Sequence, residues 1–449
     1  MVKIFFSGIG GSGVSAIAGF TAERGYTVSG SDRLFDINPE HEISRRLQSK
    51  GIRIFPQNGT GIDVSCDLAV FSTAVEKTNP DYVKAERLGI PIKTRPEYLS
   101  EIVAELDTVA VAGTSGKSTT SGMLTYLMKK LRMEPNFIGG GRVKQFKTAE
   151  NPGNFLTGSS RLLVIEACES DGTIVSYRPS YSIISNLDLD HHPVEETAEM
   201  FEKLSGNTTR FVVIGGDDKN LSSCSIEKSV KFSIDTRSDY RAKDVRYHPF
   251  KTLFTVNGER FNLSLPGKHN LYNALACVAL LSELGIPLAG ISEALTEFSG
   301  IERRFDIHLD VKNHLVIDDY AHNPHKIVNL MKTMQGISEK VCYIFQPHGF
   351  GPTRLMKDGY IGTFSTNLRE TDHLILLPIY YAGGTASKDI SSGDIAEGVA
   401  AAGRSVEVID NRNDFFSLPV LWDSYVVFGA RDDSLSDFAE KIAERVKNN

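Results

Sequence analysis

Ala112-Gly113-Thr114-Ser115-Gly116-Lys117-Ser118-Thr119-Thr120 is the stretch that decides the fold of the central part of this chain. It follows the apolar run 109–111 and leads into a helix-like segment over residues 121–131. A strand, a glycine turn and a helix in this order form a phosphate-binding loop, because backbone N–H groups and the helix dipole point at phosphate oxygens. In such a loop Lys117 reaches the outer phosphates and the Ser118 hydroxyl ligates Mg²⁺.

The loop is a short form of the motif, since the longer form has a glycine where this chain has Val111. A glycine turn of any α/β protein is the alternative interpretation. The Gly-Lys-Ser sequence and the helix that follows favour nucleotide binding. Because the loop is expected to be exposed, Lys117→Ala is predicted to abolish turnover and to leave the fold intact.

Length, charge and cysteine usage narrow the class of protein. The chain has 449 residues, of which 41% are hydrophobic, and this length suggests about three domains. A net charge of −7 argues against a nucleic-acid coat or a patch for anionic membranes. Five scattered cysteines without a Cys-x-x-Cys pair predict a reduced, cytoplasmic protein. No apolar run is long enough for a membrane span, so no membrane insertion is expected.

Strands and helices alternate along three segments, which predicts parallel sheets with crossover helices. The first segment ends after a short helix that opens at Thr94 and ends near Asp107. The second ends at Gly300-Ile301-Glu302-Arg303-Arg304-Phe305. The predicted strands lie at 2–6, 26–29, 68–72 and 92–94; at 109–111, 162–165, 182–185 and 211–214, with a β-rich patch at 231–265; and at 315–317, 341–345, 373–377, 406–408 and 425–428.

Gly8-Ile9-Gly10-Gly11-Ser12-Gly13 follows the first predicted strand and contains the dinucleotide fingerprint Gly-x-Gly-x-x-Gly. Asp32 stands at the end of the second strand, where an NAD site has its acidic residue. An NAD-dependent oxidoreductase is therefore one interpretation. The same geometry holds the diphosphate of a nucleotide-sugar, and a plain strand–helix turn is a third interpretation.

Polar residues also follow several later strands. Glu166 and Glu169 end the strand 162–165, and His191 follows the next strand, so all three are expected at one sheet edge. Carboxylates there commonly hold Mg²⁺, whereas a histidine is a less usual ligand and is often structural. His269 and Asn273 lie four residues apart on one helix face, and an asparagine can pair with adenine. The alternative for this helix start is capping by Asn270.

Six motifs, taken in order, resemble those of the Mur ligases, the ATP-dependent amide-forming enzymes of peptidoglycan synthesis. They are Gly-Thr-Ser-Gly-Lys-Ser, Glu-Ala-Cys-Glu-Ser-Asp, Asn-Leu-Asp-Leu-Asp-His, Gly-Lys-His-Asn-Leu-Tyr-Asn-Ala, Arg-Arg-Phe and Asp-Asp-Tyr-Ala-His-Asn-Pro. The opening glycine motif and Val28-Ser29-Gly30-Ser31-Asp32 resemble the branch that uses UDP-N-acetylmuramate with L-alanine or a recycled tripeptide. The resemblance covers nearly the whole chain.

This resemblance implies an α/β fold of three domains: a Rossmann-like UDP-binding domain over 1–106, a central P-loop ATPase domain over 107–302 and a Rossmann-like amine-binding domain over 303–449. It implies catalytic roles for Lys117, Glu169 and His191, and Mg²⁺ ligation by Ser118, Glu169 and His191. It places the UDP-sugar at Gly8, Gly10, Gly11, Gly13, Ser31 and Asp32, and the amine at Tyr320, His322, His348 and Arg354. It places ATP at Gly113, Thr114, Ser115, Gly116, Lys117, Ser118, Thr119, His269, Asn273, Arg304 and Asp319.

The implied reaction joins the carboxylate of UDP-N-acetylmuramate to an amino acid, with L-alanine expected, through an acyl phosphate. ATP and Mg²⁺ are the implied cofactors, small molecules the partners, and a monomer or homodimer the assembly. Alternatives are a murein peptide recycling ligase, a divergent family member with a different amine or donor, an NAD-dependent oxidoreductase, and an idle nucleotide sensor.

One departure from the family pattern concerns the amine. The branch usually shows Phe-Gln-Pro-His followed by arginines that hold carboxylates, but here Gly349 and Pro352 stand at two of those positions and only Arg354 remains. Glycine cannot replace a bidentate arginine–carboxylate contact. Tyr380-Tyr381-Ala382-Gly383-Gly384-Thr385 departs from the branch as well. We therefore expect the loop 348–354 to set the amine preference, and an arginine at Gly349 to shift it.

Overall fold

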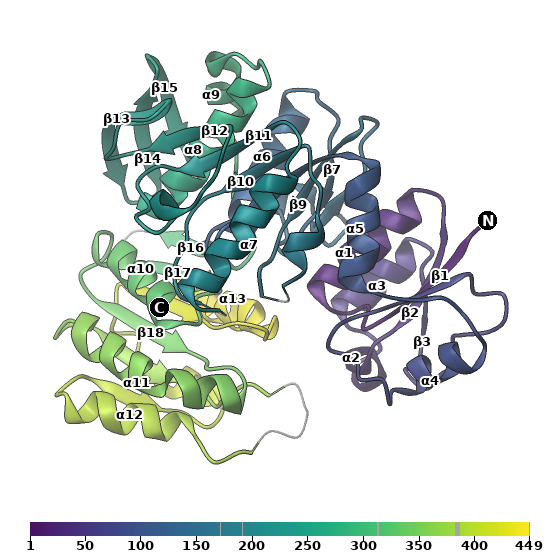
Figure 1. Ribbon diagram of the computed structural model, residues 1–449. Coiled ribbons are helices and arrows are strands. Elements are labelled where there is room, and N and C mark those ends of the chain that lie inside the picture. Colours follow the sequence, from purple (N-terminus) through teal and green to yellow (C-terminus); the bar gives the residue numbers. More distant parts are fainter. Residues whose placement is uncertain (171, 191, 312–313, 382–386, 449) are drawn as a thin grey trace. The chain divides into compact units, whose positions relative to one another are not determined.

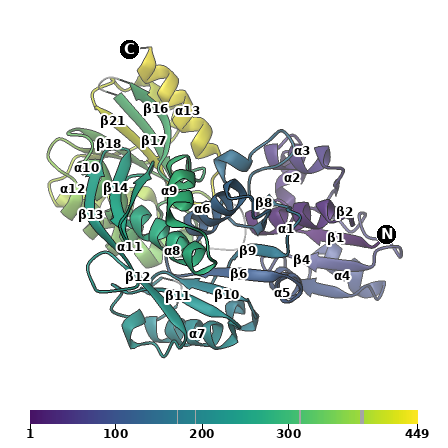
Figure 2. The same ribbon diagram turned by 90° about the horizontal axis from the view of Figure 1, so that it is seen from above.

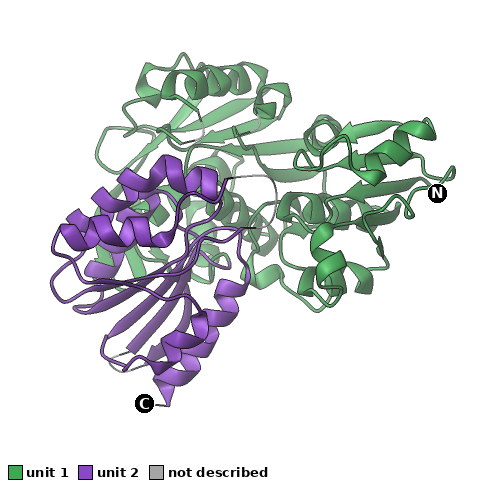
Figure 3. Ribbon diagram, turned by 90° about the horizontal axis from the view of Figure 1, so that it is seen from below, with its two compact units in different colours: residues 1–301 green, residues 302–449 purple. Residues whose placement is uncertain are grey.

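The computed structural model describes residues 1–170, 172–190, 192–311, 314–381 and 387–448 (Figure 1). The chain divides into two compact units, an N-terminal unit over Met1–Ile301 and a C-terminal unit over Glu302–Asn449 (Figure 3). Within the described residues the N-terminal unit contains a five-stranded and a ten-stranded sheet, and the C-terminal unit a six-stranded sheet. In the same residues, no helix combines the length and the apolar character that a bilayer crossing requires.

The five-stranded sheet has the order β3-β2-β1-β4-β5, and all its neighbours pair in parallel. Helix α5 opens with a capping box in which Thr94 and Glu97 bond each other's backbone N–H groups. The elements are β1 (Lys3–Ser7), α1 (Ser12–Glu23), β2 (Thr27–Ser31), α2 (Arg33–Ile37), α3 (Glu42–Ser49), β3 (Arg53–Phe55), β4 (Leu68–Phe71), α4 (Pro80–Arg87), β5 (Ile92–Thr94) and α5 (Arg95–Glu105).

The ten-stranded sheet has the order β15-β14-β13-β12-β11-β10-β6-β9-β7-β8, parallel in its middle and antiparallel at both ends. Figure 2 shows α7 on one side of β10–β12 and α8 on the other. The elements are β6 (Asp107–Ala112), α6 (Lys117–Lys130), β7 (Asn136–Ile138), η1 (Lys144–Phe146), β8 (Phe155–Leu156), β9 (Leu162–Glu166), η2 (Thr173–Ser176), β10 (Tyr181–Ile184), α7 (Val194–Asn207), β11 (Phe211–Gly215), η3 (Leu221–Ser223), β12 (Ser229–Ser233), β13 (Tyr240–His248), β14 (Lys251–Val256), β15 (Glu259–Leu263), α8 (Lys268–Glu283) and α9 (Leu288–Thr296).

One hydrophobic core joins the two sheets of the N-terminal unit. It includes Ile17 and Phe20 of α1, Phe155 of β8 and Ile165 of β9, all buried. A Cβ on Gly19 would lie 2.4 Å from the Phe155 ring, so only glycine lets α1 approach β8 this closely. A second core packs α6 and α8 against the other face of the large sheet.

The C-terminal sheet has the order β16-β17-β21-β18-β19-β20, parallel except for the edge strand β16. Strand β21 returns between β17 and β18, so the strand order reverses there, and ligands of doubly wound sheets bind at the carboxyl ends beside such a point. The elements are β16 (Asp306–Val311), β17 (His314–Asp319), α10 (Pro324–Gln335), β18 (Val341–Phe345), α11 (Phe350–Asn367), β19 (His373–Leu376), α12 (Ser392–Ala401), β20 (Val406–Val408), η4 (Arg412–Ser417), β21 (Ser424–Phe428) and α13 (Ser434–Lys447).

The α/β class and the alternation of strands and helices are confirmed, and each buried strand that the sequence predicts is present. The predicted start of α6 at residue 121 is wrong, because the Gly-Lys-Ser turn itself opens the helix at Lys117. The sequence did not predict the short strands β3, β7 and β8 or the edge strand β16. It also missed α11, whose Gly351, Pro352, Gly359 and Gly362 hide the helical pattern.

Candidate active site

The phosphate loop between β6 and α6 is shaped by two glycines. Gly113 and Gly116 have φ angles of +138° and +85°. A Cβ on Gly113 would lie 2.2 Å from the Ser185 hydroxyl, and one on Gly116 would lie 2.3 Å from Asn273 Oδ1. Any side chain at either position would be both strained and in collision, so the loop needs glycine for its conformation.

Asn186, the second residue after β10, holds this loop in place. Its Nδ2 donates to the carbonyl of Ser115 at 2.9 Å, and its Oδ1 accepts from the Ser115 N–H at 2.8 Å. The buried Thr114 donates through its hydroxyl to the carbonyl of Asp188, and Thr119 is buried in the first turn of α6. The amides of that first turn have no acceptor within the helix and remain as donors for an anion. Asn186 opens the motif Asn-Leu-Asp-Leu-Asp-His, but no role was predicted for it from the sequence. Its position just after a strand could have indicated one.

Lys117 is paired with Glu169. The Lys117 Nζ lies 2.8 Å from Glu169 Oε2 and 2.7 Å from the carbonyl oxygen of Gly113. The Lys117 side chain is only 14% exposed, and that of Glu169 only 2%. Burial is the largest single influence and opposes the charge on Lys117, but Glu169, Cys168 and Glu166 together outweigh it and raise the pKa of Lys117. The expectation of an exposed loop lysine is therefore wrong.

Glu166, and not Glu169, lies beside Ser118. The Ser118 hydroxyl donates to Glu166 Oε2 at 3.0 Å, and the other carboxylate oxygen accepts from the N–H groups of Gly140 and Gly141. A hydroxyl and a carboxylate at the N-terminus of a helix are hard oxygen donors, which suit Mg²⁺. In the part of the chain that the structure describes, no group of three or more His, Cys, Asp or Glu side chains could hold a metal ion. The predicted ligand His191 lies outside the described residues.

The predicted adenine pair is split between the surface and the interior. His269 is exposed, whereas Asn273 is buried and accepts a hydrogen bond from the Thr120 hydroxyl at 3.1 Å. These contacts make Asn273 a support for the phosphate loop. The capping alternative is wrong, because Gly267 is the N-cap of α8 and Asn270 donates to the carbonyl of Pro266.

The first glycine motif forms the turn between β1 and α1. Gly8 has a φ of +81°, and a Cβ on Gly10 would lie 2.9 Å from the Asp32 carboxyl carbon. Asp32 accepts hydrogen bonds from the N–H groups of Gly10 and Leu34. Burial raises the pKa of Asp32, and these two backbone bonds act in the opposite direction. Its carboxylate therefore holds the turn together, which removes the observation that favoured an NAD site.

The remaining residues around this turn differ in exposure. Gly11 is exposed, whereas Ser31 is fully buried and bonds the buried carboxylate of Asp81. A Cβ on Gly13 would lie 3.5 Å from the Arg95 side chain. Arg95, the first residue of α5, thus brings a cation to the exposed side of the turn, and sequence reasoning missed it.

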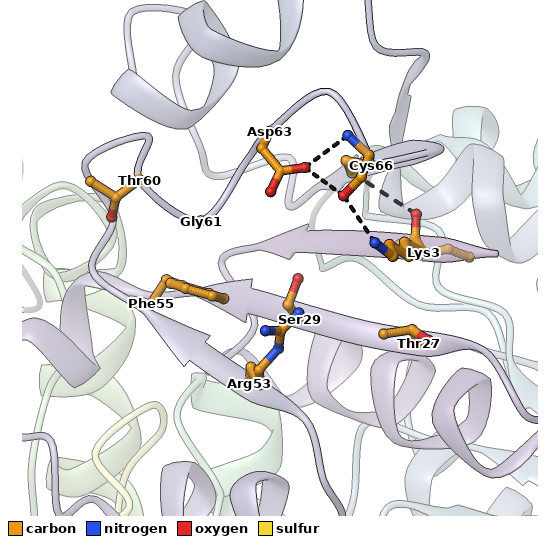
Figure 4. Close-up of a pocket in the computed structure, with 11 residues that line it drawn as sticks. Lys3, Thr27, Ser29, Arg53, Phe55, Thr60, Gly61, Asp63 and Cys66 are labelled. Carbon is orange, nitrogen blue, oxygen red and sulfur yellow. Dashed lines mark hydrogen bonds between the residues drawn. The ribbon is translucent and has the colours of Figure 1, made fainter. Parts of the chain in front are cut away.

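A pocket of about 230 Å³ lies elsewhere on the same sheet (Figure 4). Its lining includes Lys3, Thr27, Ser29 and Arg53, which come from the first three strands. It contains no residue of the glycine turn and none of the predicted site residues.

The C-terminal unit gathers its predicted residues at the carboxyl ends of β17 and β18. Asp319 accepts from the N–H groups of Phe305 and Ala321, both at 2.7 Å, so the backbone already uses both carboxylate oxygens. The Arg304 guanidinium lies 4.6 Å from the ring centroid of Tyr320. These contacts tie the start of the unit to the end of β17.

His322 and His348 are brought together here, with ring centroids 5.3 Å apart. Burial, with a smaller effect from Lys326, lowers the pKa of His322 to about 3, so this imidazole is neutral at physiological pH. Its Nδ1 lies 2.9 Å from the carbonyl oxygen of Tyr320, which leaves Nε2 as the acceptor nitrogen. Arg354, in α11, pairs with Asp389, so its charge is already matched.

The chain matches known proteins over nearly its whole length. Three family profiles match consecutive parts: Mur ligase family, catalytic domain (3–106), Mur ligase middle domain (111–281) and Mur ligase, glutamate ligase domain (303–431). The UDP-N-acetylmuramate–L-alanine ligase of Syntrophotalea carbinolica is 34% identical over 89% of this chain and 88% of its own. The ligase of the same name from Fusobacterium nucleatum is 32% identical over 100% and 97%.

Solved structures agree with these matches. The crystal structure of the UDP-N-acetylmuramate–alanine ligase of Thermotoga maritima superimposes with a TM-score of 0.83 at 29% identity, with both chains fully covered. A murein peptide ligase from Psychrobacter arcticus shares the fold, with a TM-score of 0.70 at 22% identity over 100% of this chain and 99% of its own. The chain therefore belongs to the Mur ligase family.

Proposed function

We propose that this protein is an ATP-dependent ligase that joins UDP-N-acetylmuramate to L-alanine in peptidoglycan synthesis. The observation that carries this is the phosphate loop with its two separate carboxylate partners, Glu166 on Ser118 and Glu169 on Lys117. It occurs in a chain whose relatives of that name match it over about nine tenths of its length or more. The amide-forming reaction needs a γ-phosphate held at such a loop and an amine brought to the activated carboxylate.

The sugar carboxylate attacks the γ-phosphorus of ATP, which gives an acyl phosphate and ADP; the amine then attacks the acyl carbon and phosphate leaves. Lys117 and the first-turn amides of α6 stabilise the negative charge on the transferring phosphoryl group. Ser118 and Glu166 fit Mg²⁺, which when bound neutralises phosphate charge. The neutral Nε2 of His322, beside His348 at the carboxyl edge of the C-terminal sheet, can accept a hydrogen bond from the incoming amine.

The remaining assignments complete the proposal. The UDP-sugar diphosphate binds the exposed side of the turn formed by Gly8, Gly10, Gly11 and Gly13, beside Arg95. His191 is proposed as a further metal ligand, His269 and Arg304 as ATP contacts, and His348 as an amine contact. The domain ranges 1–106, 107–302 and 303–449 stay predictions, as do a cytoplasmic location and a monomeric or dimeric state.

The variants Glu166→Gln and Glu169→Gln are expected to separate a role in Mg²⁺ binding from a role in catalysis through Lys117. Loss of the carboxylate beside Ser118 should raise the Mg²⁺ concentration for half-maximal activity by about tenfold or more, comparable to the loss of supporting interactions at other metal sites. Glu169→Gln should lower kcat and leave the Mg²⁺ dependence within about twofold, because Glu169 contacts Lys117. Mg²⁺ titrations of both variants check this, and a Mg²⁺ shift confined to Glu169→Gln would reverse the assignment.

The test of the function is ADP release with UDP-N-acetylmuramate and Mg²⁺, with L-alanine, L-serine, glycine and the murein tripeptide as separate amines. The largest kcat/KM is expected with L-alanine. A signal with the tripeptide alone would make the protein a recycling ligase. Silence with every amine would overturn the proposal. A thermal-shift titration with NAD should give no change, and a shift would restore the oxidoreductase interpretation.

A further inference from the structure

The starting point is the set of basic side chains at the carboxyl edge of the C-terminal sheet. An amino-acid substrate carries a carboxylate, and a site for it needs a cation that the protein has not already matched. Arg303 is paired with Asp318, Arg412 with Asp432, and Arg354 with Asp389. The arginine that remains in the loop 348–354 is therefore not the best candidate for binding that carboxylate.

Lys388, shortly before α12, differs from these arginines because it lies against two aromatic rings. Its Nζ lies 5.3 Å from the ring centroid of Tyr381 and 6.0 Å from that of Phe350. The two rings meet edge to face, with centroids 5.2 Å apart. Among the described residues, no carboxylate forms an ion pair with Lys388. A cation over aromatic rings is held in place and keeps its full charge for a ligand.

Backbone hydrogen bonds hold the segments of Phe350 and Tyr381 at the carboxyl edge of the C-terminal sheet, where the amine is proposed to bind. The N–H of Gly349 donates to the carbonyl of Tyr380, and the N–H of Tyr380 donates to the carbonyl of Pro347, both at 2.8 Å. His348 and Tyr380 form an isolated parallel bridge. These contacts join the loop after β18 to the loop after β19. They set Phe350 and Tyr381 side by side and next to His348, whose ring contacts that of His322.

We propose that Lys388 binds the carboxylate of the amine substrate, with Phe350 and Tyr381 as positioning residues for its ammonium group. This inference rests on the proposed function and names a specificity determinant for the same site. A lysine binds a carboxylate as a point charge without the fixed geometry of a guanidinium. The site therefore recognises an α-carboxylate but restricts its orientation less than a pair of arginines would.

Gly349→Arg, the substitution that the sequence suggested, does not test this cleanly. Gly349 has a φ of +68°, and a Cβ there would lie 3.2 Å from the Pro352 ring. Any side chain at this position strains the start of α11, so a change in activity would not isolate the lost or gained charge.

The experiment measures ADP release by the full chain with the amino acid that the panel identifies, L-alanine as expected, and with its carboxamide, which lacks the carboxylate charge. The wild type should prefer the acid over the amide by about tenfold or more, as for a hydrogen bond to a charged group. Lys388→Ala should raise the KM for the acid by about the same factor and erase the preference. Its kcat and its KM values for ATP and UDP-N-acetylmuramate should stay within about twofold.

Lys388→Arg should restore the preference, and Lys441→Ala, which removes another exposed lysine of the C-terminal unit, should leave it unchanged. Lys388 is exposed, so the melting temperature of Lys388→Ala should match that of the wild type. If Lys388→Ala keeps the wild-type preference for the acid, the inference is overturned while the proposed function stands. If the wild type releases no ADP with any amine, both fall.

Discussion

Lys117→Ala is expected to lower the rate of ADP formation by about 10³-fold or more, because it removes the one cation that the phosphate loop offers a transferring phosphoryl group. The same change should also lower the melting temperature. The Glu169 carboxylate is 2% exposed and would lose the ammonium that lies 2.8 Å from it. A buried charge left without its partner destabilises a fold. Steady-state kinetics and thermal unfolding of the same preparation measure the two effects.

The double variant Lys117→Ala/Glu169→Gln separates them. Glutamine removes the uncompensated charge, so the double variant should regain most of the melting temperature and none of the activity. Lys130→Ala is the matched control, since Lys130 lies on the same helix α6 and pairs with Glu297 at the surface. Full activity in Lys117→Ala would contradict the proposed role and favour the idle nucleotide sensor.

The sequence was sufficient to predict the buried strands and the phosphate loop, because their patterns lie in consecutive residues. Apolar runs such as 341–345 and 425–428 coincide with β18 and β21, because buried parallel strands are short and continuously apolar. The phosphate loop was predictable for the same reason, since its glycines, its lysine and its helix are consecutive in the chain. Edge strands of two or three residues, such as β8, carry too little pattern to be found this way.

The sequence could not predict which of two neighbouring carboxylates serves which partner. Glu166 ends β9 and turns to Ser118, whereas Glu169 lies in the loop beyond and reaches Lys117. A spacing of three residues does not reveal this, because the path of the chain after the strand decides it. Asp32 illustrates the same limit: its position fits a ribose contact, yet its carboxylate bonds the glycine turn beside it.

Arg303→Met is expected to destabilise the C-terminal unit by roughly 3–5 kcal/mol, the usual cost of removing one partner of a buried ion pair. The Arg303 side chain is 6% exposed, and its Nε lies 3.1 Å from Asp318 Oδ2, which is fully buried. The same guanidinium donates to the carbonyls of Gly429 and Asp432, so it joins β17 to the loop after β21. Trp422, the single tryptophan of the chain, lies in this unit, and its fluorescence in urea reports the unfolding midpoint.

The pH dependence of that midpoint distinguishes a charge effect from a packing effect. Burial raises the pKa of Asp318 to about 7 even though Arg303 lowers it, whereas the unfolded carboxyl titrates near pH 4. Between about pH 4 and pH 7 the native state binds the extra proton, so this group's contribution to stability is complete below pH 4 and is lost as the pH rises through 7. Without Arg303 the pKa of Asp318 in the native state moves higher, so stability should continue to fall as the pH rises above 7. Asp318→Asn in the Arg303→Met background should abolish this additional pH dependence of stability. If stability still falls above pH 7 in the double variant, the effect of Arg303 is one of packing and not of charge.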